Sequence, residues 1–145
     1  MTDKEYREAK AKVLRVYSSW KNELGLRDWA IRLHFERGAP EETTPFVVLG
    51  VTSASWAYKI AEITFHLANF KDRTDYEIEE IVVHELCHIL VCEMRTTVPS
   101  QEMSTEMNRH EERVVTQLAR AFIWTRDAGR KVRKANGRKR GKSGL

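Results

Sequence analysis

His84 and His88 lie four residues apart, and Glu85 directly follows the first of them. On an α-helix, residues four apart project from the same face about one turn apart, so both imidazoles can bind one zinc ion. Glu85 falls beside this pair, where its carboxylate can accept a proton from a water molecule that the ion activates. This spacing therefore predicts metal-assisted hydrolysis, with His84 and His88 as metal ligands and Glu85 as general base.

A catalytic zinc site uses three protein ligands and leaves one position open. The run Arg109-His110-Glu111-Glu112-Arg113 supplies three candidates for the third ligand. On a helix, Glu111 projects to the centre of the apolar stripe, Glu112 toward one edge and His110 toward the other. A carboxylate at the centre of a buried face needs a compensating partner. We therefore expect Glu111 as the third ligand, with Glu112 as the second choice and His110 as the third.

The same residues also fit an interpretation without a metal. A pattern with three fixed positions in five occurs by chance, and two histidines with a glutamate can form a buried hydrogen-bonded cluster. The metal interpretation is favoured because these polar groups interrupt the apolar runs Ile81-Val82-Val83 and Ile89-Leu90-Val91. Imidazole and carboxylate groups are costly in such surroundings unless something compensates them.

Three helices are expected to surround this site. Thr2-Asp3-Lys4-Glu5 is a capping-box pattern and predicts a first helix that ends at Gly25. Thr74-Asp75-Tyr76-Glu77 is a second one and begins the helix that carries the histidines, which is apolar on nearly all sides and therefore belongs inside. A third helix should start between Ser100 and Thr105 and end near Asp127.

Three strands are expected between the first two helices. Residues 29–35 alternate apolar and polar side chains, residues 46–49 form an apolar run that could continue to 51, and residues 57–67 alternate again. In the last segment Ala61, Ile63, Phe65 and Leu67 should face inward, with Glu62, Thr64 and His66 outward. The order of elements predicts an α+β domain with helices on one face of a small sheet.

Charge is distributed unevenly along the 145 residues. The net charge is +4, yet residues 130–145 hold eight Lys or Arg and no acid, which leaves 17 bases and 21 acids in residues 1–129. We therefore expect residues 1–129 to form one domain and residues 130–145 to form a disordered basic tail. Such a tail can bind phosphates electrostatically and predicts a nonspecific tether to nucleic acid. A solvated terminal extension is the simpler alternative.

The composition also bears on location. No apolar run reaches the length of a membrane span, and the charged start of the chain lacks a secretory signal. Cys87 and Cys92 lie five apart in one predicted helix, where their side chains point in different directions. Two such thiols fit a reducing compartment. We expect a cytoplasmic protein with no membrane partner.

His84-Glu85-Leu86-Cys87-His88, followed by Glu111 after 22 intervening residues, resembles the motif of the gluzincin metallopeptidases. The chain is similar to minimal gluzincins and to metallopeptidases encoded by phages and prophages, and more distantly to ImmA/IrrE-type proteases. The phage-type similarity extends from Leu26-Arg27-Asp28-Trp29 through Ala121. The resemblance implies a zincin-like fold with one catalytic Zn²⁺ and a peptide substrate aligned along the sheet edge. A phage-encoded member would act in the host cytoplasm.

The sequence thus predicts a zinc-dependent metallopeptidase that hydrolyses peptide bonds. One alternative is a catalytically silent zincin-like binding module, although a purely structural metal site has no need for Glu85. Another is a nucleic-acid-associated protease similar to the SprT type, with the basic tail as its tether. Tyr58 and His66, expected on the strand before the histidine helix, are candidates to stabilise an oxyanion.

Overall fold

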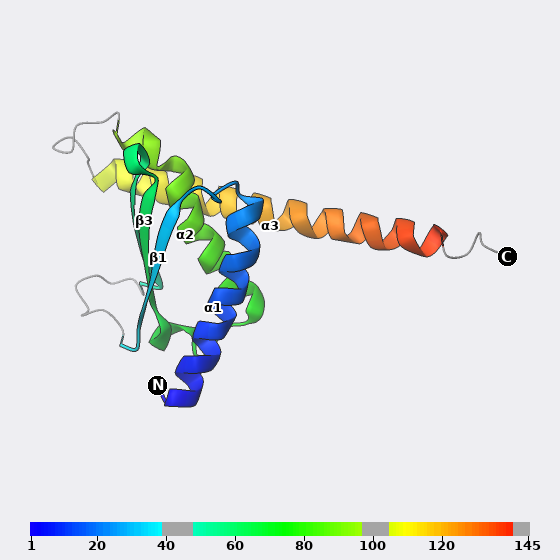
Figure 1. Cartoon of the computed structure of the whole chain (residues 1–145), viewed down its shortest axis with the longest axis horizontal. Helices are drawn as coiled ribbons and strands as arrows, with labels where there is room; N and C mark the ends of the chain where they lie inside the picture. The colour runs from blue at the N-terminus through cyan, green and yellow to red at the C-terminus, as the bar shows by residue number, and fades with distance from the viewer. Residues whose placement is uncertain (39–47, 97–104, 141–145) are drawn as a thin grey trace.

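The structure is a computed structural model that describes residues 1–38, 48–96 and 105–140, with only the backbone described for residues 95, 96 and 134–140. Three helices and a three-stranded mixed sheet form one small α+β domain, as predicted (Figure 1). The elements are α1 (Asp3–Glu23), β1 (Ala30–Glu36), β2 (Gly50–Ser55), η1 (Trp56–Tyr58), β3 (Ile60–His66), η2 (Leu67–Phe70), α2 (Asp75–Thr96) and α3 (Thr105–Arg140).

Both predicted capping boxes are present. In α1 the amide of Glu5 donates to Thr2 Oγ1 at 3.3 Å, and the amide of Thr2 donates to Glu5 Oε2 at 2.8 Å. In α2 the amide of Glu77 donates to Thr74 Oγ1 at 3.2 Å, and the amide of Thr74 donates to Glu77 Oε2 at 2.8 Å. Gly25 follows α1 with a positive φ of 73°, which glycine adopts at little cost. These local contacts set where both helices begin and where α1 ends.

The central strand of the sheet is β3, which pairs parallel with β1 and antiparallel with β2. Ala61, Ile63 and Phe65 are buried on its inner face, as predicted. The outward expectation for His66 is wrong, because its side chain is only 8% exposed and its Nδ1 lies 3.1 Å from Glu36 Oε2 on β1. These two residues are in register at the end of the β1–β3 pair, and their contact keeps the ring against the sheet.

The predicted strand boundaries differ from the structure around β2. Residues 46 and 47 lie outside the described part of the chain, and the strand begins only at Gly50 and continues to Ser55. The bounds of β2 are determined by its pairing with β3 and not by the apolar run at residues 46–49. This pairing extends from Gly50 opposite Phe65 to Ser55 opposite Ile60. The strand predicted at residues 57–67 is also shorter in the structure, where it is β3, preceded by η1 and followed by η2.

Helix α2 is the centre of the domain, in contact with β2, α1 and α3 (Figure 1). It is apolar nearly all round, and its buried residues pack into a core shared with α1, α3 and the inner face of the sheet. The core residues of α2 are Ile78, Val82, Val83, Leu86, Cys87, Ile89, Val91 and Cys92. A helix enclosed in this way can hold polar side chains only where they contact one another or a ligand.

Helix α3 is longer than predicted. It continues to Arg140, so residues 130–140, expected to be disordered, are helical, whereas residues 141–145 lie outside the described part. Packing of Val115, Ala119 and Ile123 already nucleates α3, and extension needs only propagation through good helix formers such as Lys, Arg and Ala. Gly129 and Gly137 each cost only about 1 kcal/mol and do not end the helix. None of the described helices has the combination of length and apolarity that crossing a bilayer requires.

Candidate metal centre

His84 and His88 project from α2 toward α3 and are mostly buried, with side-chain exposures of 22% and 13%. Their Nε2 atoms lie 3.2 Å apart and their rings are nearly perpendicular, at 78°. The predicted convergence of the two imidazoles is therefore present. Both rings direct the same nitrogen toward a common point between α2 and α3.

Glu112 of α3 completes a triangle of donor atoms with this pair. Its Oε2 lies 3.2 Å from His84 Nε2, and its Oε1 lies 3.4 Å from His88 Nε2. Two donors bound to one tetrahedral zinc ion at 2.0–2.1 Å lie about 3.3–3.4 Å apart. The group His84, His88 and Glu112 therefore has the donor types and separations that suit a zinc ion. Glu112 is 59% exposed, which leaves this side of the site open to solvent.

Glu111 occupies a different position from the one expected of a ligand. Its Oε1 lies 2.9 Å from His88 Nδ1, on the opposite side of the ring from Nε2, and its side chain is 13% exposed. Thr116 Oγ1 lies 3.4 Å from His84 Nδ1. Partners at the Nδ1 atoms fix the ring orientation and leave both Nε2 atoms directed at the donor triangle. Glu111 is thus placed to orient the His88 ring.

The order of preference for the third ligand therefore changes, although the ligand role of each acid stays a prediction. Glu111 was expected first because it projects to the centre of the buried stripe, and it is indeed the more buried of the two acids. The histidine tips, however, face the edge of that stripe, where Glu112 lies. His110 lies outside the group, with its Nε2 3.7 Å from Glu106 Oε1 and its side chain 60% exposed.

Glu85 lies against strand β2. It is buried, and Thr52 Oγ1 donates to its Oε2 at 2.6 Å. Burial raises the pKa of Glu85, although the Thr52 hydrogen bond and the two histidines act in the opposite direction. A Cβ atom at Gly50 would lie 2.7 Å from Glu85 Cδ, so any larger residue here would displace the Glu85 carboxylate. Strand β2 thus holds the carboxylate against the helix.

The surroundings of the histidines are acidic. Burial lowers the pKa of His84, but the hydrogen bond to Glu112 and the charges of Glu85, Glu112 and Glu80 outweigh it, so that the pKa is raised. An imidazole pair ringed by carboxylates favours positive charge at its centre, either a proton or a metal ion. This electrostatic preference agrees with the donor triangle.

The site borders a shallow hollow of about 590 Å³ along α3. Glu112 and Thr116 belong to its lining, together with Arg109, Arg113 and Arg120. It gives room for a ligand beside the donor triangle, and three of its lining residues are arginines.

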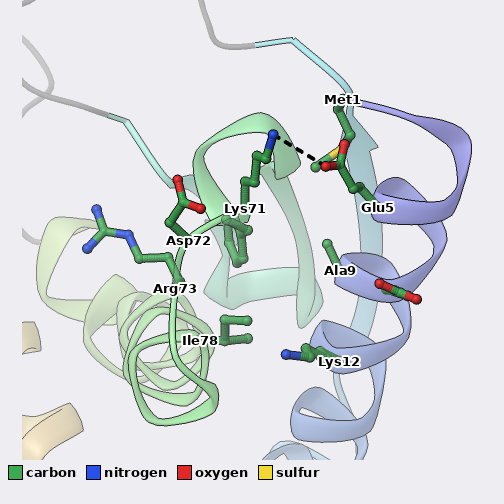
Figure 2. Close-up of a pocket in the computed structure, with 10 residues that line it drawn as sticks. Met1, Glu5, Ala9, Lys12, Lys71, Asp72, Arg73 and Ile78 are labelled. Atoms are coloured by element: carbon green, nitrogen blue, oxygen red, sulfur yellow. Dashed lines mark ion pairs between the residues drawn. The ribbon is translucent and has the colours of Figure 1, made fainter.

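A second, smaller hollow of about 200 Å³ lies between α1, η2 and the first turn of α2 (Figure 2). Figure 2 shows Lys71 and Glu5 facing each other across it, and their ion pair measures 3.3 Å. Lys12, which also lines it, pairs with Asp75 at 2.7 Å. Because these bases are paired with nearby acids, we assign no function to this hollow.

Neither of the two residues considered for oxyanion stabilisation belongs to the donor triangle, and that role stays a prediction. Tyr58 is 78% exposed in η1, and His66 contacts Glu36. Cys87 and Cys92 are buried thiols, and burial raises the pKa of Cys87 to about 12, which fits a packing role.

Three residues that the sequence analysis did not select contribute to the site: Gly50, Thr52 and Thr116. The one available signal was Gly50, because a glycine within a strand often marks a close approach of another group.

Comparisons with known proteins add no family assignment: no family model matches the chain, and no curated protein or solved structure matches it.

Proposed function

We propose that this protein is a zinc-dependent metallopeptidase, with His84, His88 and Glu112 as zinc ligands and Glu85 as general base. The observation that carries the proposal is the triangle of donor atoms, with separations of 3.2, 3.2 and 3.4 Å. A bound zinc ion would supply Lewis acidity, polarising the scissile carbonyl and lowering the pKa of water. Glu111 and Thr116 would hold the two rings in their ligating orientation.

Glu85 is suited to proton transfer. Its Oε2 accepts a hydrogen bond from the Thr52 hydroxyl, which leaves Oε1 as the oxygen that can take up the transferred proton. Burial raises the pKa of this carboxyl above its ordinary value, which is the direction that suits a group that first takes and then returns a proton. The same carboxyl can deliver the proton to the leaving amine. Thr52 and Gly50 keep it in one position between these steps.

A peptide is the substrate class that the sheet favours. In the described part of the chain, β2 pairs only with β3, so its other edge presents backbone N–H and C=O groups. An extended peptide can add to such an edge as a further strand. Because Gly50 and Thr52 of β2 also touch Glu85, a peptide on this edge would lie beside the proposed base.

The test is the isosteric variant Glu85→Gln, compared with Glu8→Gln on the exposed surface of α1. We expect the wild type and Glu8→Gln to bind one zinc ion and to cleave members of a peptide library. Glu85→Gln should bind zinc equally but lose cleavage by at least about a hundredfold, the range typical of general-base removal. Cleavage at an unchanged rate by Glu85→Gln would refute the assignment. Stoichiometric zinc without cleavage by the wild type would favour a binding module instead.

A further inference from the structure

The C-terminal third of α3 extends beyond the domain. Ile123 is the last buried residue among the described side chains of this helix. Arg126 is anchored to the domain by Glu79 and lies 3.8 Å from the Trp20 ring. Figure 1 shows the helix continuing away from α1, α2 and the sheet after this point. Residues 130–140, here named the basic arm, are helical and about 16 Å long at 1.5 Å per residue.

The basic arm and the domain carry opposite charges. Residues 130–145 contain eight bases and no acid, whereas residues 1–129 have a net charge of −4. Arg130, Lys131 and Arg133 are exposed, and Arg130 lies 3.8 Å from Asp127 in a long ion pair. Exposed positive charge concentrated on a projecting helix attracts polyanions. The negative domain would be repelled by a polyanion, so binding would be confined to the arm.

We propose that the basic arm binds duplex DNA without sequence specificity. A helix with its side chains is about 10–12 Å wide, and the major groove of B-DNA, about 12 Å wide, admits it between two rows of phosphates. The deep, narrow major groove of duplex RNA does not. The arm has no aromatic residue for stacking on single strands. Its only apolar residues, Val132 and Ala135, are too few for insertion into a membrane.

The experiment measures binding of the full chain to a short fluorescent DNA duplex by anisotropy, from about 50 to 200 mM salt. The arm variant is Arg130→Gln/Lys131→Gln/Arg133→Gln, because glutamine removes charge and preserves helix propensity. The matched control is Lys4→Gln/Arg7→Gln/Arg15→Gln, which removes the same charge from exposed positions of α1. Circular dichroism verifies equal helicity in all three proteins.

We expect wild-type affinity to fall steeply with salt. The arm variant should bind about tenfold more weakly at low salt, and its log–log salt slope should be smaller by about 2 to 3. The control should stay within about twofold of the wild type. Equal losses in both variants would overturn the proposal, because binding would then follow total charge.

Tighter binding to single-stranded DNA, duplex RNA or phosphatidylserine-containing vesicles than to the duplex would also overturn it. The proposal would also be overturned if the full chain did not bind the duplex and instead self-associated through the arm in a salt-sensitive way. None of these measurements depends on zinc or on peptide cleavage, so their failure leaves the proposed function untouched.

Discussion

The two adjacent acids of α3 make different contacts, and this difference predicts the effect of removing each one. Glu112 lies 3.2 and 3.4 Å from the two Nε2 atoms, whereas Glu111 lies 2.9 Å from His88 Nδ1. Glu112→Gln should therefore remove a zinc ligand, and Glu111→Gln should only loosen the orientation of one ring. Both substitutions preserve shape and remove one negative charge, so a general electrostatic effect would weaken zinc binding equally.

The expected magnitudes differ, with the larger loss for Glu112→Gln. Four-ligand zinc sites bind with about 10–16 kcal/mol, or roughly 2.5–4 kcal/mol for each ligand, which corresponds to a loss of about 70- to 900-fold for Glu112→Gln. Loss of a hydrogen-bond partner of a ligand typically costs about 10- to 100-fold, the range expected for Glu111→Gln. The exposed His110 should contribute nothing, so His110→Gln is the control.

Zinc affinity can be measured by titrating metal-free protein in competition with a chromophoric chelator at neutral pH. The expected order of dissociation constants is Glu112→Gln above Glu111→Gln, with His110→Gln equal to the wild type. The reverse order of the two acid variants would refute the reasoning and restore Glu111 as the ligand. A large effect of His110→Gln would show that α3 presents another face to α2.

Three further perturbations test the supporting structure. Gly50→Ala places a Cβ 2.7 Å from Glu85 Cδ, so peptide cleavage should fall at least about tenfold with zinc retained, and an unchanged kcat/KM would argue against this contact. The folded-state pKa of Glu85 is raised above the ordinary value of 4.5. Its contribution to the free energy of unfolding is therefore fully present below about pH 4.5 and is lost as the pH rises through the folded-state pKa. In urea unfolding of metal-free protein, Glu85→Gln should therefore be more stable than wild type at pH 7 and equal to it below about pH 4, and a difference independent of pH would contradict this. Arg126→Ala removes the ion pair to Glu79 and the cation over Trp20, and should lower the free energy of unfolding by about 2–3 kcal/mol in the same assay, far more than the exposed control Arg7→Ala.

Local patterns in the sequence predicted most of the elements. Both capping boxes begin the expected helices, because the contacts that they make span three residues and need no tertiary partner. The approach of His84 and His88 follows from helical geometry alone. Alternation likewise predicted the buried residues of β3 up to Phe65. These features depend on short separations along the chain, which is why they could be inferred without the fold.

The features that the sequence did not decide depend on contacts between distant segments. Glu111 and Glu112 differ by about 100° around the axis of α3, so the rotation of α3 against α2 determines which acid faces the Nε2 atoms. The placement of Gly50 and Thr52 against Glu85 follows from the register of β2 on β3. The helical state of residues 130–140 follows from nucleation by the packed part of α3. Sequence periodicity describes each element separately, whereas these outcomes depend on how one packed element is oriented relative to another.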